Sequence, residues 1–264
     1  MKKNNFILLA LVLLASVVSQ AIELKKQSVN YGTADKKFVG YLTQPKTINK
    51  MTPAILIVHN WMGLTDETKH QADRFAELGY VVFAADIYGK GQNPQEAKAA
   101  GELAGKYKKD RGLFRENLTL ALNELKKQKN VDVKQLAVAG YCFGGTGSIE
   151  LARTGADLVG VISFHGGLDS PTPTDGKNIK AKVLAFHGAD DPYVAAADLT
   201  AFEDEMRNNK IDFQLVKYGN TVHSFTEKAA GNDNSKGAAY NASADVRSFK
   251  SAQNFLAEIF KKNK

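Results

Sequence analysis

A single cysteine lies in the most suggestive segment of this 264-residue sequence, GYCFGG at 140–145. The segment follows the apolar run 135–139 and precedes a stretch of helical periodicity, so the chain must turn sharply from a strand into a helix. Glycines at 140 and 144 remove side chains that would clash in such a turn and leave residue 142 exposed at its tip. The amides and dipole at the start of a helix favour a thiolate. The pattern therefore predicts that Cys142 is a nucleophile rather than a buried, inert thiol.

Two later loops carry an acid and a histidine. Residues 187–194 read HGADDPYV and residues 219–225 read GNTVHSF, each after an apolar run. The order nucleophile, acid, histidine is that of α/β-hydrolases. His223 would accept the thiol proton, and an aspartate would hold the imidazole in the required tautomer. Asp190 and Asp191 compete for that role; we favour Asp191, because Pro192 constrains the chain just after it while Asp190 suits a local turn contact.

Other residues near the predicted strand ends are candidates for binding. The loop HNWMG at 59–63 places an amide opposite the cysteine loop, so the backbone N–H groups of Trp61 and Phe143 are predicted to form an oxyanion hole. Asn60, Lys90 and His165 are further candidates for contact with substrate, although loop-ordering hydrogen bonds suit His165 better. No metal site is predicted, because no histidine pair or Cys/His cluster has the required spacing.

Apolar β-rich runs alternate with helical segments along the whole chain. Several runs are apolar at every position, as expected for parallel strands with helices on both faces. Residues 28–31 and 37–43 alternate in polarity and predict an antiparallel edge pair. The expected strands are 54–58, 80–84, 135–139, 158–162, 182–186 and 213–217; the expected helices are 65–78, 94–127 with a break near Asp110, 144–153, 195–208 and 242–262.

Residues 1–21 have the pattern of a secretory signal peptide. Lys2 and Lys3 precede the apolar run 6–18, and Ser19 and Ala21 are small residues suited to cleavage after Ala21. The run is short for a membrane span, which makes an uncleaved anchor the less favoured alternative. We expect a periplasmic or secreted protein whose mature part, 22–264, is one domain.

The charge of the chain does not indicate a nucleic-acid partner. The net charge is +7, and removal of residues 1–21 takes away two lysines and no acid, leaving +5. The basic residues are spread along the chain with acids between them, without a basic groove pattern. We expect a monomer that acts on a small molecule and has no stable membrane span after cleavage.

With these residues in place, the sequence resembles the dienelactone hydrolase family over about 29–260. The most specific part is GYCFGG at 140–145, supported by GADDP at 188–192, VHSF at 222–225 and DIY at 86–88. The resemblance implies an α/β-hydrolase fold, a triad of Cys142, Asp191 and His223, and no cofactor. It also implies that carboxylic esters or lactones are hydrolysed through an acyl-thioester.

The sequence departs from the family pattern at two positions. Asn60 stands where well-studied members have a glutamate that helps to convert the thiol to a thiolate, and Lys90 corresponds to an arginine that binds the substrate carboxylate. These departures and the lone exported thiol motivate an alternative: a non-catalytic ligand-binding or thiol-sensing protein on the same scaffold.

Overall fold

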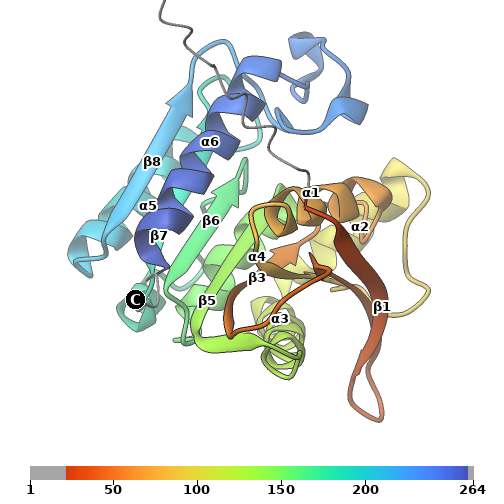
Figure 1. Ribbon diagram of the computed structural model, residues 1–264. Helices are drawn as coiled ribbons and strands as arrows, with labels where there is room; N and C mark the ends of the chain where they lie inside the picture. The colour runs from red at the N-terminus through yellow and green to blue at the C-terminus, as the bar shows by residue number, and fades with distance from the viewer. Residues whose placement is uncertain (1–21, 261–264) are drawn as a thin grey trace, which may run out of the picture.

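Eight strands form one sheet in the order β1-β2-β4-β3-β5-β6-β7-β8 in the computed structural model, which describes residues 22–260 (Figure 1). The predicted signal peptide lies outside these residues. The strands β3 to β8 run parallel to their neighbours, whereas β1 pairs antiparallel with β2 and β2 antiparallel with β4. The strands are β1 (Leu24–Gly32), β2 (Lys37–Pro45), β3 (Thr52–Val58), β4 (Val81–Ala85), β5 (Val131–Tyr141), β6 (Gly160–Phe164), β7 (Lys182–Gly188) and β8 (Phe213–Tyr218).

Helices cover both faces of this sheet. Two of them pack on one face and four on the other, as the two clusters of buried apolar side chains show. The first pair is α1 (Asp66–Ala76) and α6 (Ala242–Ile259); the others are α2 (Ala97–Lys109), α3 (Arg111–Lys126), α4 (Phe143–Arg153) and α5 (Ala196–Asn208). The predicted α/β-hydrolase fold, with antiparallel strands at the N-terminal edge, is confirmed.

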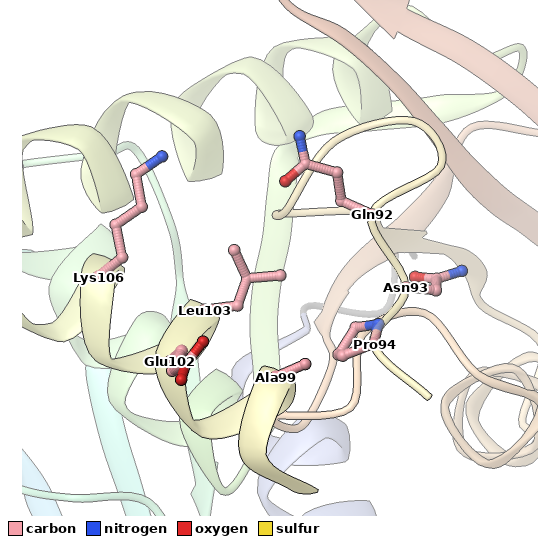
Figure 2. Close-up of a pocket in the computed structure, with 7 residues that line it drawn as sticks. All are labelled: Gln92, Asn93, Pro94, Ala99, Glu102, Leu103 and Lys106. Atoms are coloured by element: carbon pink, nitrogen blue, oxygen red, sulfur yellow. The ribbon is translucent and has the colours of Figure 1, made fainter. Parts of the chain in front are cut away.

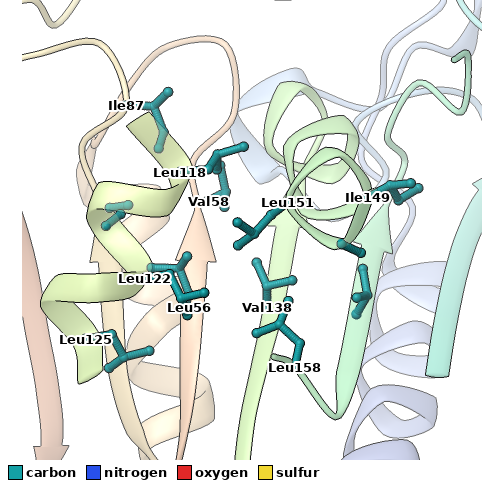
Figure 3. Close-up of a cluster of buried hydrophobic side chains, with 14 of the residues drawn as sticks. Leu56, Val58, Ile87, Leu118, Leu122, Leu125, Val138, Ile149, Leu151 and Leu158 are labelled. Atoms are coloured by element: carbon teal, nitrogen blue, oxygen red, sulfur yellow. The ribbon is translucent and has the colours of Figure 1, made fainter. Parts of the chain in front are cut away.

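The central strands are apolar throughout because both of their faces are buried. In β3, Ile55 and Ile57 pack toward α1 and α6, whereas Leu56 and Val58 point into the opposite layer. Figure 3 shows that opposite layer, in which Val58 lies near Leu118 and Leu56 lies near Leu122, both of α3. Side chains alternate across a strand, so each apolar run supplies both cores at once.

The predicted helical break at Asp110 is also present. Asp110 ends α2 and caps α3, because its side chain accepts a hydrogen bond of 2.9 Å from the Leu113 N–H. Strand β6 begins two residues later than expected, since Val159 still bonds to the Leu136 carbonyl before the regular ladder starts at Gly160. Among residues 22–260, none of the helices combines the length and hydrophobicity that crossing a bilayer requires.

Candidate active site

The turn between β5 and α4 holds Cys142 in a backbone conformation that is uncommon for a residue with a side chain, with φ 54° and ψ −116°. Two close backbone approaches make this turn possible. A Cβ atom on Gly140 would lie 1.9 Å from the Gly144 carbonyl oxygen, and one on Gly144 would lie 2.1 Å from the Val58 carbonyl oxygen. Both glycines are therefore required by sterics, and the cysteine side chain stands at the carboxyl end of the central strands.

Three side chains from three loops meet at this point. The Cys142 Sγ lies 3.0 Å from Nε2 of His223, and Nδ1 of His223 lies 2.7 Å from Oδ2 of Asp191. The other oxygen of Asp191 accepts a 2.8 Å hydrogen bond from the Tyr193 N–H, which holds the carboxylate in place. Asp191 is buried and Asp190 is exposed. Of the two adjacent acids, the structure therefore brings Asp191 to the histidine.

The environment of His223 favours its charged form. Burial of the ring opposes protonation, but the Cys142 thiolate and the hydrogen-bonded Asp191 carboxylate outweigh it and raise the pKa of His223 to about 10. A protonated His223 beside the sulfur is an ion-pair partner for a thiolate. The arrangement can therefore both stabilise a thiolate and supply a proton.

His165 lies beneath the cysteine turn rather than in the cavity above it. Its Nδ1 lies 3.1 Å from the Cys142 backbone nitrogen, and its Nε2 lies 2.8 Å from the Thr226 hydroxyl. Burial, with a smaller contribution from repulsion by His223, lowers its pKa well below the usual value. A neutral ring that accepts from the Cys142 N–H and donates to Thr226 ties two loops together. This placement differs from the substrate contact considered for His165, because the side chain is fully buried.

A cavity of about 380 Å³ opens above the cysteine. It is lined by residues of six segments: Trp61, Gly101, Ala104, Gly105, Lys108, Cys142, Phe143, Tyr193, His223, Ser224 and Ala238. Phe143 is the first residue of α4, so its N–H has no partner within the helix. The amide-bearing residues Trp61 and Phe143 thus both border the space around the sulfur, where an oxyanion would form.

The loop that carries Trp61 is held by buried polar contacts. The Tyr88 hydroxyl donates a 2.9 Å hydrogen bond to the Trp61 carbonyl. His59 joins the same loop to the segment after β4. Its Nδ1 lies 2.6 Å from the Asn60 carbonyl oxygen, and its Nε2 accepts a 3.1 Å hydrogen bond from the Ile87 N–H. Burial lowers the pKa of His59 to about 4, so the ring stays neutral and keeps this tautomer. The loop is thereby positioned by contacts that substrate does not have to make.

Two predicted substrate contacts lie outside the cavity. Asn60 is 7% exposed, and its Oδ1 accepts a 2.9 Å hydrogen bond from the Met62 N–H within the same loop. Lys90 borders separate surface hollows near Lys37, to whose carbonyl its N–H donates. The Asn60 side chain points into the protein because it bonds within its own loop. Lys90 lies away from the cysteine cavity because it belongs to the turn after β4.

Lys108 is the lysine that lines the cavity. The sequence motifs did not point to this residue. Gly101, Ala104, Gly105 and Lys108 form one face of α2, at spacings of three, four and seven residues. The small residues leave room beside Trp61, and the lysine stands at the end of the same face. This periodicity of small residues was a signal in the sequence, but it became meaningful only once α2 was seen to cover the cysteine.

A second hollow, of about 440 Å³, lies on another side of α2. Figure 2 shows it between the segment 92–94 and the α2 side chains Ala99, Glu102, Leu103 and Lys106. Its lining contains no thiol, hydroxyl or imidazole. Within residues 22–260, no cluster of three or more His, Cys, Asp or Glu side chains is suited to a metal ion.

Comparison with known proteins agrees with this geometry. The model of the dienelactone hydrolase family matches residues 38–260, which is most of the chain and includes every residue of the cysteine site. The chain belongs to the dienelactone hydrolase family. As a member of that family, it is a hydrolase.

Solved structures of this family are similar in both sequence and fold. One, described as m3DLH, is 34% identical, with a TM-score of 0.87 over 90% of this chain and 99% of its own. A dienelactone hydrolase-like promiscuous phosphotriesterase, P91, from metagenomic libraries is 35% identical, with a TM-score of 0.86 over 92% of this chain and 100% of its own. Among relatives found by sequence, a Bradyrhizobium protein named "Probable 2-oxo-3-(5-oxofuran-2-ylidene)propanoate lactonase" is 27% identical over 75% of this chain and 83% of its own length.

Proposed function

We propose that this hydrolase cleaves small carboxylic esters or lactones with Cys142 as its nucleophile. The observation that carries the proposal is the chain of contacts from Cys142 to His223 to Asp191, at 3.0 and 2.7 Å, on the wall of a cavity large enough for a small acyl compound. The family name and the lactonase relative support the same substrate class.

In the first half of the reaction, the Cys142 thiolate attacks the carbonyl carbon. A C–S bond forms, and the electron pair of the C=O bond moves to oxygen, where the N–H groups of Trp61 and Phe143 stabilise it. The tetrahedral species collapses, the C–O bond to the leaving group breaks, and protonated His223 gives its Nε2 proton to the departing alkoxide. The acyl group is left on the sulfur as a thioester.

In the second half, water resolves the thioester. His223, now neutral, takes a proton from water as the water oxygen attacks the carbonyl carbon. The second tetrahedral species expels the thiolate, which re-forms the pair of thiolate and imidazolium. Asp191 keeps the His223 ring oriented and stabilises its charge in both halves. No cofactor takes part in the proposed steps.

The test uses purified residues 22–264 with 4-nitrophenyl acetate, 4-nitrophenyl butyrate and simple lactones, under reducing conditions. Cys142→Ala is expected to lose turnover by at least about 10³-fold. Asp191→Asn is expected to lose about 10²-fold or more, whereas its matched control Asp190→Asn keeps the wild-type rate. Circular dichroism establishes that the variants fold.

Two results would contradict this proposal. Wild-type turnover by Cys142→Ala would mean that another group is the nucleophile. Absence of turnover in the wild type, together with rapid alkylation of Cys142, would favour the alternative of a non-catalytic ligand-binding or thiol-sensing protein.

A second candidate activity is hydrolysis of phosphotriesters, favoured by the 35% identity to a protein described as a promiscuous phosphotriesterase. The same thiolate would attack phosphorus and expel a good leaving group. A 4-nitrophenyl phosphotriester in the substrate panel tests it. Release of nitrophenol by the wild type and not by Cys142→Ala would support the activity, and no release would exclude it for that substrate.

We also propose that the protein is exported, since residues 1–21 have the signal-peptide pattern. We propose separately that it acts as a monomer. Expression of the full chain in a bacterium, followed by fractionation and N-terminal sequencing, is expected to give a periplasmic or secreted product that begins at Ile22. A membrane-bound product that begins at Met1 would support the anchor alternative. Light scattering on the exported product tests the monomer.

A further inference from the structure

Glu227 is a buried carboxyl close to the site that the proposed mechanism does not use. It follows His223 by four residues and is 8% exposed. Its carboxyl lies close enough to the side chains of Asn60 and Ser224 for both to favour its charged form. Because the Oδ1 of Asn60 already accepts from Met62, the Asn60 amide group donates toward Glu227. Glu227 therefore connects the loop of His223 to the loop of Trp61.

The Glu227 carboxyl also lines a small space beside Asn60. A cavity of about 10 Å³ is lined by Asn60, Glu67, Thr68, Gln71, Tyr141 and Glu227, which is room for about one water molecule. Both Glu227 and Tyr141 line this space, and the Glu227 Oε1 and the Tyr141 hydroxyl have no hydrogen-bond partner among residues 22–260. Buried polar atoms are normally paired, so the space suits a bridging water.

We propose that Glu227 is an ionisable positioning residue: it joins the His223 loop to the oxyanion loop through Asn60, and its negative charge favours the imidazolium of His223 and hence the Cys142 thiolate. Asn60 cannot accept a proton, whereas the carboxyl behind it can. The inference rests on the proposed roles of Cys142 and His223, and it adds a second carboxyl to the one that touches His223 directly.

The surroundings of Glu227 place its ionisation in the neutral range. Burial raises the pKa of Glu227 to about 7, against the opposing effects of the Asn60 hydrogen bond and the His223 charge. From α1, Glu67 adds a repulsion in the same direction as burial. From β5, Tyr141 faces the carboxyl, with Arg74 and Asp245 beyond it. Glu227 thus changes charge between about pH 6 and 8, while His223 remains protonated.

The experiment compares the wild type with Glu227→Gln, which keeps the shape and one acceptor but cannot ionise. Glu67→Gln is the matched control, because it removes a carboxyl from the same small cavity without touching Asn60 or Ser224. Two rates are followed from pH 5 to 9: kcat and KM for 4-nitrophenyl acetate, and alkylation of Cys142 by iodoacetamide.

In the wild type, both kcat and the alkylation rate are expected to rise through a step near pH 7. Glu227→Gln should lack that step, with rates close to the wild type at pH 5.5 and about tenfold lower above pH 8, which corresponds to about one pKa unit of coupling. KM should change little, because Glu227 does not line the substrate cavity. Glu67→Gln should keep the step and move it only toward lower pH, because it removes a repulsion that raises the pKa of Glu227.

A constant ratio between Glu227→Gln and the wild type at all pH values would overturn the proposal, because a merely structural contact does not titrate. Absence of the step in the wild-type alkylation profile would overturn it without any variant. Alkylation does not require turnover. A protein that shows the step in alkylation but hydrolyses no ester would therefore refute the proposed function and leave the role of Glu227 supported.

Discussion

Replacement of Glu227 by glutamine should stabilise the protein at neutral and alkaline pH. The pKa of this carboxyl is raised from 4.5 to about 7 in the folded protein, chiefly by burial. A raised folded-state pKa contributes stability that is fully present below the unfolded pKa and is lost as pH rises through the folded value. The native protein therefore loses stability between about pH 4.5 and 7 on account of Glu227.

The size of this loss follows from the shift. A difference of between two and three pKa units corresponds to about 3 kcal/mol in the free energy of unfolding. The residue is only 8% exposed, so solvent screening reduces this little. Glutamine does not ionise, and any pH-independent cost of its amide cancels in a comparison between two pH values. The difference in unfolding free energy, Glu227→Gln minus wild type, should increase by about 3 kcal/mol from pH 4.5 to pH 8.

Urea denaturation at pH 4.5, 6, 7 and 8 measures this difference, with the fluorescence of Trp61, the single tryptophan, as the signal. The urea midpoint of the variant, taken relative to that of the wild type, should rise by about 1 M or more between pH 4.5 and pH 8. Glu67→Gln provides the control for removal of a neighbouring charge. A difference that stays constant within about 0.5 kcal/mol across the four pH values would refute the reasoning, since Glu227 would then titrate alike in the folded and unfolded chains.

Three further predictions concern the site. Above the step expected near pH 7, the kcat/KM of the wild type should hold through pH 9 and fall above about pH 10, where His223 loses the proton needed by the leaving group. A decline centred near pH 6.5 would contradict the raised pKa of His223. Gly144→Ala should lower the free energy of unfolding by about 3 kcal/mol or more, because the new Cβ would clash with the Val58 carbonyl. The control Gly219→Ala, whose Cβ would have nothing within 4 Å, should change it by less than about 0.5 kcal/mol, and urea denaturation of both variants tests this. Lys108→Ala should lower kcat/KM about threefold to tenfold more for an ester with a carboxylate than for its neutral analogue, and equal losses on the two substrates would remove Lys108 as an anion contact.

The features predicted correctly from sequence are those with a local signal. The parallel strands were visible because each strand is buried on both faces, which makes its whole run apolar. The break at Asp110 was visible because an aspartate can cap the helix that follows it. The order of cysteine, aspartate and histidine located three loops at the same edge of the sheet, since parallel strands end together.

The choice between adjacent or similar residues needed the folded chain. Asp190 and Asp191 differ by one position, and burial brings only Asp191 to His223. Lys90 lies in the loop after β4 and Lys108 lies near the end of α2, but only the helical face of Lys108 covers the cysteine.

By itself, the amino-acid sequence determined the strand and helix pattern, the glycine turn around Cys142 and the chain order of the three reactive side chains. These depend on periodicity and on backbone sterics, which act over a few residues. Only the tertiary structure decided which groups share a space: the inward turn of Asn60, the position of His165 beneath Cys142, and the burial of Glu227 between two loops. Such contacts join residues as far apart as 60 and 227, and no local pattern encodes the packing that brings them together.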